Sequence, residues 1–451
     1  MTQSEQDSHL KTILNSGAKN AAELQQRLGV SQPTLSRIIQ RNRHQVVTLG
    51  QARATLYALA RPIGDLGHII PVYQVQASGD VRKYAMLYAL ANRQYYWQPT
   101  QERGQLYNHL PWFIENLRPE GFLGRAFAGR CQSQNLPDRL ADWSDQHLLT
   151  VLAKGGCDLP GNLIIGDVTL GAYLGNQGNS TISIKESERE SRYPQLAEEA
   201  MAGDPPGSSA GGEQPKFCIR IDNGVPHHVL VKFTPPIHTN EGRRWADLLI
   251  CEHLALQAIT AADREAAQSQ LFFFGERAFL EVQRFDRIGG IGRRGITHLG
   301  VLEDEFSGEA RDRWHLSAFR LNNSGIIRDG DVENMCWLEA FGRLIANTDR
   351  HFGNISFFTD ALPFRLCPVY DMLPMHYRPA ASGELIDRPY TIPEPDVKLQ
   401  PYWSDTISWA RTFWGNVASD PRVSNEFQII AQRQAEHLAV LDTATGPRLL
   451  T

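Results

Sequence analysis

Residues 344–358 read LIANTDRHFGNISFF, and residues 366–374 read LCPVYDMLP. In the first stretch an apolar helix end runs into a polar turn, where Asn354 follows Asp349 by five residues, and in the second Asp371 lies among short apolar strands. Phosphoryl transfer needs a carboxylate that orients the acceptor hydroxyl and accepts its proton, and hard oxygen ligands that hold Mg²⁺ against the phosphates. Asp349, Asn354 and Asp371 supply this set in the order and approximate spacing of protein kinases. The alternative is an Asx-rich turn between a helix and a strand, because this spacing alone is common by chance.

The composition is that of a globular protein of 451 residues, with 42% of them hydrophobic and 21% charged. A chain of this length predicts two or three domains. The net charge of −5 excludes a module that binds polyanions over its whole surface, so affinity for nucleic acid would need a local basic patch. None of the six cysteines forms a CxxC pair, which argues against a zinc site or a disulfide framework. The polar N-terminus lacks a signal peptide and no apolar run is long enough to cross a bilayer, so we expect a soluble, cytoplasmic protein without a membrane partner.

The hydrophobic pattern changes along the chain. Roughly the first 60 residues predict short helices, residues 69–96 and 216–283 predict strands, and the chain from Trp314 onward is mainly helical. Residues 176–216 are rich in Gly, Ser, Glu and Pro and predict a linker or mobile loop. Strands followed by helices predict an α+β fold rather than alternating βαβ units.

A small-residue loop precedes the second group of strands. Residues 207–217 read GSSAGGEQPKF, and Gly211 and Gly212 would let backbone N–H groups approach phosphate oxygens closely. The loop matches neither GxxxxGKS nor GxGxxG, so a flexible linker is the alternative.

Lys232 lies in HHVLVKF, a predicted strand with alternating apolar residues. Such a lysine usually extends to solvent, but here it could reach the α- and β-phosphates of a nucleotide. Glu252, in the apolar helix WADLLICEHLAL, is the best candidate to pair with it, and Glu241 is the rival. A surface glutamate is the alternative for either residue.

Four separated motifs, in order, resemble those of the HipA family of bacterial toxin kinases. The signature S-x-x-G-x-Q-x-K matches Ser209, Gly212, Gln214 and Lys216; RFDR matches residues 284–287; N-x-D-R-H-x-x-N matches residues 347–354; and the metal-binding Y-D pair matches Tyr370 and Asp371. The segment WFIENLRPEG also resembles the N-terminal subdomain motif of the family. The similarity covers roughly residues 70–440.

The resemblance implies a role for each matched residue. Asp349 would be the catalytic base, Asn354 and Asp371 the Mg²⁺ ligands, and Lys232 the catalytic lysine that binds phosphate. The residues expected at the ATP site are Ser209, Gly211, Gly212, Gln214, Lys216, Gln283, Arg284, Phe285, His351 and Tyr370, of which Gln283, Arg284 and Phe285 would form the hinge that meets adenine.

A serine in the glycine-rich loop of the family is autophosphorylated, which silences the enzyme. Ser209 occupies that position here, with Ser208 beside it. The added phosphate would place nearly two negative charges where the ATP phosphates must lie. The loop departs from the family at Glu213, which adds a negative charge, and at Pro215, which removes an N–H donor.

Residues 21–45 read AAELQQRLGVSQPTLSRIIQRNRHQ, a pattern that predicts a helix-turn-helix. Gly29 would make the turn and Ser31 would cap the second helix. That helix would expose the side chains suited to reading base edges in a major groove, Gln32, Thr34, Ser36 and Arg37, while Arg41 and Arg43 suit phosphates. The alternative is a helical hairpin that only packs on the rest of the chain.

The resemblance implies a bilobal, protein-kinase-like fold with an added N-terminal module. Residues 1–65 would form an all-α helix-turn-helix domain, residues 66–175 a β-rich N-terminal subdomain, residues 176–290 the kinase N-lobe with the glycine-rich loop, and residues 291–451 the helical C-lobe with the catalytic loop. A fused module of this kind resembles the HipH/YjjJ-like branch of the family.

The function expected from these features is a growth-inhibiting, toxin-type protein serine/threonine kinase that uses ATP and Mg²⁺ and binds DNA through its N-terminal module. Related toxins phosphorylate an aminoacyl-tRNA synthetase, which is the candidate substrate, and a homodimer on symmetric DNA is expected by analogy with other helix-turn-helix proteins. A Mg²⁺-dependent nuclease is one alternative, although the sequence lacks the dense cluster of carboxylates and histidines expected of a two-metal nuclease. A transcription factor that keeps a kinase-like fold is the other.

Overall fold

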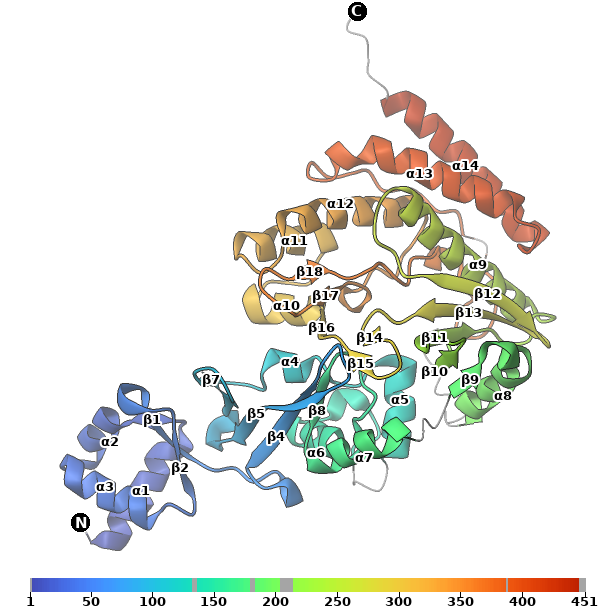
Figure 1. The fold of residues 1–451 in the computed structure, drawn as a ribbon. Coiled ribbons are helices and arrows are strands. Elements are labelled where there is room, and N and C mark those ends of the chain that lie inside the picture. Colours follow the sequence, from blue (N-terminus) through green and yellow to red (C-terminus); the bar gives the residue numbers. More distant parts are fainter. Residues whose placement is uncertain (1, 132–135, 179–182, 203–213, 387, 446–451) are drawn as a thin grey trace, which may run out of the picture. The chain divides into compact units, whose positions relative to one another are not determined.

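The computed structural model describes residues 2–131, 136–178, 183–202, 214–386 and 388–445. The chain forms two compact units (Figure 1), which we call the N-terminal unit (Met1–Arg118 and Cys131–Asn179) and the C-terminal unit (Pro119–Arg130 and Ser180–Thr451). Each unit contains both sheets and helices, so the predicted α+β class is confirmed. Among the residues described, no helix combines the length and apolarity needed to span a membrane.

The N-terminal unit begins with three helices, α1 (Gln3–Asn15), α2 (Ala21–Leu28) and α3 (Gln32–Arg41). A capping box between Asn20 and Glu23 starts α2, and Gly29 ends it in the left-handed conformation with φ +66°. The expectation that this region is all-α is wrong: a small antiparallel sheet packs with the helices, in the order β1 (Lys19–Asn20), β3 (Leu56–Leu59) and β2 (Val46–Leu49). The β-branched and aromatic residues of β2 and β3 gain their strand conformation by pairing with each other.

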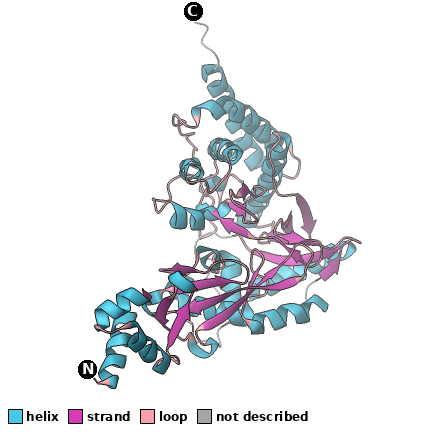
Figure 2. Cartoon of the chain, turned by 60° about the vertical axis from the view of Figure 1, so that its left-hand side comes forward, coloured by secondary structure: helices cyan, strands magenta, loops and turns pink. Residues whose placement is uncertain are grey.

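A five-stranded antiparallel sheet forms the second part of the N-terminal unit, with its strands in magenta in Figure 2. Its order is β7 (Gln105–Tyr107), β6 (Tyr95–Pro99), β5 (Val81–Ala89), β4 (Ile69–Val75) and β8 (Leu163–Ile165). The helices are α4 (Trp112–Glu115), α6 (Asp145–Gly155) and α7 (Asp167–Gly178). Alternate residues of the central strands, such as Val72 and Leu87, bury one face of the sheet against Leu149 and Leu152 of α6.

The C-terminal unit contains a second five-stranded sheet, in the order β12 (Ser269–Phe274), β13 (Arg277–Gln283), β11 (His227–Phe233), β10 (Lys216–Asp222) and β9 (Ser183–Lys185). The strands expected over residues 216–283 are confirmed. Helices α8 (Arg189–Ala202) and α9 (Asn240–Ala261) lie on opposite faces of this sheet, and α5 (Gly121–Arg130) also belongs to the unit.

The prediction that residues 176–216 are a linker is wrong for two described segments, since β9 joins the sheet and α8 covers it. Helix α8 buries Tyr193, Leu196 and Ala197 against Val229 and Val231 of β11. This apolar burial stabilises the helix, and it is hard to see in the sequence because the segment as a whole is polar.

The rest of the C-terminal unit is mainly helical, as expected, with α10 (Leu299–Phe306), α11 (Trp314–Asn323), α12 (Asp329–Leu344), α13 (Gln400–Ser419) and α14 (Asn425–Thr445). Short antiparallel strands interrupt it: β14 (Arg287–Ile288) pairs with β15 (Gly292–Arg293), and β17 (Ser356–Phe358) lies between β16 (Ile296–His298) and β18 (Arg365–Leu366). The end of α12 and the start of β17 frame the Asp349 loop, and Asp371 follows β18.

Candidate active site

Lys232, Glu252 and Asp371 form a cluster in the C-terminal unit. The Nζ atom of Lys232 lies 2.7 Å from each carboxylate oxygen of Glu252 and 2.5 Å from Oδ1 of Asp371. The backbone N–H of Asp371 also donates to Glu252, over 3.2 Å. Lys232 comes from β11, Glu252 from α9, and Asp371 from the segment after β18. Glu252 is therefore the partner of Lys232, as the sequence favoured, and Glu241 is not.

The cluster sets two carboxylates against one ammonium. Burial lowers the pKa of Lys232, but the charges of Asp371 and Glu252 outweigh it and raise that pKa. Burial would raise the pKa of Asp371, yet the Lys232 ammonium lowers it to about 2. The pKa of the fully buried Glu252 is raised because burial outweighs the attraction of Lys232. These three groups carry one negative charge in excess, which the nearby charge of Lys216 offsets in part, and such a buried site attracts a cation.

The Asp349 loop is held by its own polar groups. The Asp349 N–H donates to Oδ1 of Asn347 over 3.0 Å, and Nδ2 of Asn354 donates to the Asp349 carbonyl over 2.9 Å. Asn347 and Asn354 are buried, whereas Asp349 is partly exposed. Because the amide nitrogen of Asn354 is used in the loop, its amide oxygen is the atom suited to a cation. The carboxylate of Asp349 is left at the surface, where a second substrate could reach it.

Two contacts join the Asp349 loop to the Asp371 segment. Nδ2 of Asn347 lies 3.4 Å from the sulfur of Met372, and the Tyr370 hydroxyl donates to the Gly353 carbonyl over 2.7 Å. Asp371 itself has φ +58°, a left-handed conformation that is rare for a residue with a side chain. Backbone strain of this kind persists only where the surrounding structure holds it in place, and it is found most often at functional sites.

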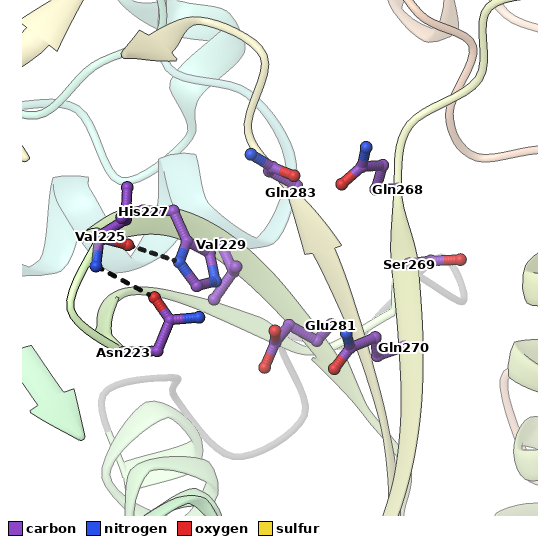
Figure 3. A pocket seen from close by; sticks show the side chains of 9 residues that line it. All are labelled: Asn223, Val225, His227, Val229, Gln268, Ser269, Gln270, Glu281 and Gln283. Carbon is purple, nitrogen blue, oxygen red and sulfur yellow. Dashed lines mark hydrogen bonds between the residues drawn. The ribbon is translucent and has the colours of Figure 1, made fainter. Parts of the chain in front are cut away.

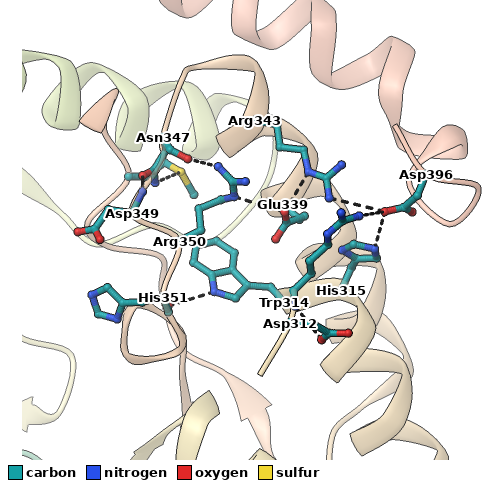
Figure 4. Close-up of polar contacts among 12 residues, drawn as sticks. Asp312, Trp314, His315, Glu339, Arg343, Asn347, Asp349, Arg350, His351 and Asp396 are labelled. Carbon is teal, nitrogen blue, oxygen red and sulfur yellow. Dashed lines mark hydrogen bonds and ion pairs between the residues drawn. The ribbon is translucent and has the colours of Figure 1, made fainter. Parts of the chain in front are cut away.

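A buried ion-pair network lies behind the Asp349 loop (Figure 4). Nε of Arg350 lies 3.3 Å from Oε1 of Glu339, and Nε of Arg343 donates to the same oxygen over 3.0 Å. The indole N–H of Trp314 donates to the His351 carbonyl over 3.1 Å. The sequence reasoning missed Glu339, Arg343 and Trp314. The i, i+4 spacing of Glu339 and Arg343 on the helix before the loop is the signal that could have found the first two.

The other residues expected at the ATP site, and their neighbours in the glycine-rich loop, fall into several groups. Ser208, Ser209, Gly211, Gly212 and Glu213 lie outside the described residues.

The amide nitrogen of Gln214 donates to the Phe233 carbonyl, and Lys216 begins β10, where its charge acts on both Glu252 and Asp371. The exposed His351 uses its ring Nδ1 to accept the Gly353 N–H, and Tyr370 is partly buried, with its hydroxyl 2.7 Å from Oγ of Ser356.

The three residues of the predicted hinge, Gln283, Arg284 and Phe285, have different surroundings. Gln283 pairs with Val229, so its side chain lies on the α8 face, opposite to Lys232, and lines a surface cavity of about 470 Å³ (Figure 3). A contact between Gln283 and adenine would therefore have to come from its backbone. Arg284 forms a two-pronged ion pair with Asp286, and Phe285 packs against Tyr370 and Phe358.

Within the described residues, no group of three or more His, Cys, Asp or Glu side chains could hold a metal ion. A divalent cation would instead rest on Asn354, Asp371 and oxygens of the substrate. Mg²⁺ is commonly bound by one or two carboxylates together with substrate phosphates.

The exposed face of α3 was the predicted DNA contact. Gln32, Ser36 and Arg37 are exposed, and Thr34 is partly buried with its hydroxyl 3.2 Å from that of Ser31. Arg41 pairs with Asp7 of α1 over 2.9 Å, and so it also ties α3 to α1.

Two regions of the chain match known protein families. Residues 66–174 match the family model of the YjjJ-like toxin middle domain, and residues 208–434 match the HipA-like C-terminal domain. The Toxin YjjJ of Escherichia coli strain K12 is 37% identical over 440 residues, which cover 96% of this chain and 98% of that protein. The chain belongs to the YjjJ toxin family, whose C-terminal domain is HipA-like. The expected membership is thereby confirmed.

Among solved structures, the chain is similar to HipA of Shewanella oneidensis MR-1, from a complex with HipB and operator DNA, with 16% identity and a TM-score of 0.46 over 83% of this chain and 95% of that one. It is also similar to the proinflammatory kinase CtkA of Helicobacter pylori, with 12% identity and a TM-score of 0.36 over 52% of this chain and 97% of that one.

Proposed function

We propose that this protein is a toxin-type, ATP- and Mg²⁺-dependent protein serine/threonine kinase that also binds DNA through its N-terminal helices. The observation that carries the kinase proposal is the cluster of Lys232, Glu252 and Asp371, which comes from three separate elements and is bonded through its flanking residues to the Asp349 loop. An ion pair with a purely structural role would not need two carboxylates, Glu252 and Asp371, for one ammonium. Nor would it need Asp371 in a left-handed backbone conformation beside the partly exposed carboxylate of Asp349.

In this proposal each side chain positions a group or moves a proton. Lys232, fixed by Glu252, would bind the α- and β-phosphates of ATP. The Asp349 carboxylate would orient a serine or threonine hydroxyl and accept its proton while the hydroxyl oxygen bonds to the γ-phosphorus and the bond to ADP breaks. Asn354 and Asp371 would hold Mg²⁺, which when bound neutralises charge on the phosphate oxygens. Ser209, or Ser208 beside it, would be the autophosphorylation site.

The test is transfer of ³²P from [γ-³²P]ATP to the protein itself and to proteins of a cell extract. We expect Asp349→Asn to abolish transfer while keeping the thermal unfolding temperature, and Asp360→Asn, a surface carboxylate, to keep both. Equal transfer by Asp349→Asn and the wild type would refute the kinase proposal. A plasmid-nicking assay with Mg²⁺ and without ATP separates it from the nuclease alternative, and labelled extract proteins identify whether an aminoacyl-tRNA synthetase is the substrate.

The DNA-binding proposal rests on α3, whose exposed polar face follows a glycine turn from α2, with the β2–β3 hairpin beside it. We propose that Gln32, Thr34, Ser36 and Arg37 contact bases, that Arg41 contacts phosphate, and that a homodimer binds a two-fold symmetric site. Selection from a random duplex pool, followed by a gel shift, tests this. Arg37→Ala should weaken binding to the selected duplex at least tenfold, whereas Arg411→Ala in α13 should not. Failure of the wild type to select any duplex would overturn it.

The domain boundaries proposed are residues 1–65, 66–175, 176–290 and 291–451, with a small sheet added to the first domain. Limited proteolysis with mass spectrometry tests them, since linkers between domains are cleaved first.

A further inference from the structure

The segment that follows Asp371 carries a carboxylate that contacts two arginines and a histidine. Oδ2 of Asp396 lies 2.9 Å from Arg313, 3.0 Å from His315 and 3.6 Å from Arg343. His315 and Arg343 are buried, while the side chain of Asp396 is 31% exposed. A cluster of this kind is what kinases commonly use to bind the phosphate of an activation segment.

The same segment makes a second contact with the end of α12. The Tyr390 hydroxyl donates to the Arg343 carbonyl over 2.8 Å. Oδ1 of Asp396 also accepts the N–H of Leu399 over 3.2 Å, which fixes the chain where it enters α13. Asp396 thus joins the end of the segment to α11 and α12.

Arg343 continues the connection to the Asp349 loop. It shares Oε1 of Glu339 with Arg350, and Arg350 donates through Nη1 to the Asn347 carbonyl, two residues before Asp349. Glu339 is only 2% exposed, so its charge is poorly screened by solvent. Arg350 is the one residue of this relay that belongs to the loop.

The backbone of α12 is shaped to admit Arg350. A Cβ atom at Gly342 would lie 2.7 Å from Cδ of Arg350, closer than carbon atoms can approach. Glycine is otherwise among the least favourable residues inside a helix. The space it leaves is an observation independent of the ion pairs, and it concerns the same arginine.

We propose that Asp396, Arg343, Glu339 and Arg350 form a positioning relay that holds the Asp349 loop and the segment after Asp371 in the arrangement needed for phosphoryl transfer. Asp396 supplies permanently the negative charge that a phosphate supplies in switched kinases, so this segment needs no phosphorylation to be ordered. The inference rests on the proposed kinase function. None of the four residues touches the reacting groups; each acts through the next.

The test measures kcat and KM for ATP together with hydrogen exchange of the loop amides in the full chain. We expect Glu339→Gln and Gly342→Ala each to lower kcat by about 100-fold, the loss typical of a small misplacement, with KM for ATP changed less than threefold. Asp396→Asn should behave in the same way, and Asp396→Glu should recover activity. Asp442→Asn, which breaks the exposed pair between Arg411 and Asp442, is the matched control and should change nothing.

Hydrogen exchange separates the failure of the relay from that of the kinase proposal. Glu339→Gln and Asp396→Asn should speed exchange in residues 347–354 and 388–399 relative to the wild type and Asp442→Asn. Unchanged exchange in both segments overturns the relay, whether or not the wild type transfers phosphate. Faster exchange with unchanged kcat would also overturn it, by reducing these residues to a structural role.

Discussion

Replacing Glu252 by glutamine tests the charge balance on which the proposed active site depends. Glu252 is fully buried and accepts two contacts of 2.7 Å from Lys232 and one of 3.2 Å from the Asp371 N–H. A glutamine offers one neutral oxygen and turns its N–H₂ group toward an ammonium. Removing one partner of a buried ion pair typically costs about 3–5 kcal/mol, and the Asp371 carboxylate that remains beside Lys232 offsets part of that loss. The expected net decrease in the free energy of unfolding is about 2–3 kcal/mol.

For a unit of this size, that decrease corresponds to a fall in Tm of roughly 5–10 °C. Differential scanning fluorimetry measures it, with and without Mg²⁺ and ATP. Because Lys232 would then pair with Asp371 alone, the excess negative charge disappears. We therefore expect the Tm increase caused by Mg·ATP in the wild type to be mostly lost in Glu252→Gln.

Glu241→Gln is the matched control, since Glu241 lies in the first turn of the same helix and is partly exposed. Its loss should cost less than about 1 kcal/mol, the usual contribution of a charge near a helix N-terminus. If Glu252→Gln lowered Tm no more than Glu241→Gln and kept the full response to Mg·ATP, the reasoning about the cluster would be refuted.

Three further predictions concern stability. Burial, aided by the charge of Arg311, lowers the pKa of His298 from 6.5 to about 4. As the pH falls, the unfolded chain therefore binds this proton before the folded chain does, and acidification from about pH 6.5 to 4 should remove up to ~3 kcal/mol of stability. Urea titrations of His298→Gln should show a weaker pH dependence than those of the wild type. Gly29→Ala should cost about 1 kcal/mol from its left-handed backbone alone, because no atom lies within 4 Å of the added Cβ, and an unchanged urea midpoint would contradict this. Glu281→Ala removes the buried partner of Arg189 and Tyr193 and should cost about 3–5 kcal/mol, whereas the exposed Glu198→Ala should cost under about 1 kcal/mol by the same measurement.

Local sequence patterns determined several of the strands, turns and loops of this protein. The spacing of Asp349 and Asn354, the strand that carries Lys232, and the turn at Gly29 are properties of a few adjacent residues. They could be predicted because the hydrogen bonds concerned join neighbours in the chain, such as Asn354 with the Asp349 carbonyl. The cap expected at Ser31 is wrong in its chemistry: Ser31 stands at the N-cap of α3, but its side chain makes no capping hydrogen bond and its hydroxyl lies 3.2 Å from that of Thr34. The resemblance to the HipA family then assigned these separated motifs to one active site.

Only the tertiary structure decided which distant groups meet. Lys232 and Asp371 are 139 residues apart in the sequence, and the choice of Glu252 over Glu241 depends on how α9 lies against the sheet. The face occupied by Gln283 followed from its register with Val229, and the strands β2 and β3 formed because each supplied the other's hydrogen bonds. Asp396 carries no local signal, because its cationic partners Arg313 and Arg343 come from the start of α11 and from α12. Local energies select helices, strands and turns, whereas ion pairs and sheet registers arise from packing between segments that no short window contains.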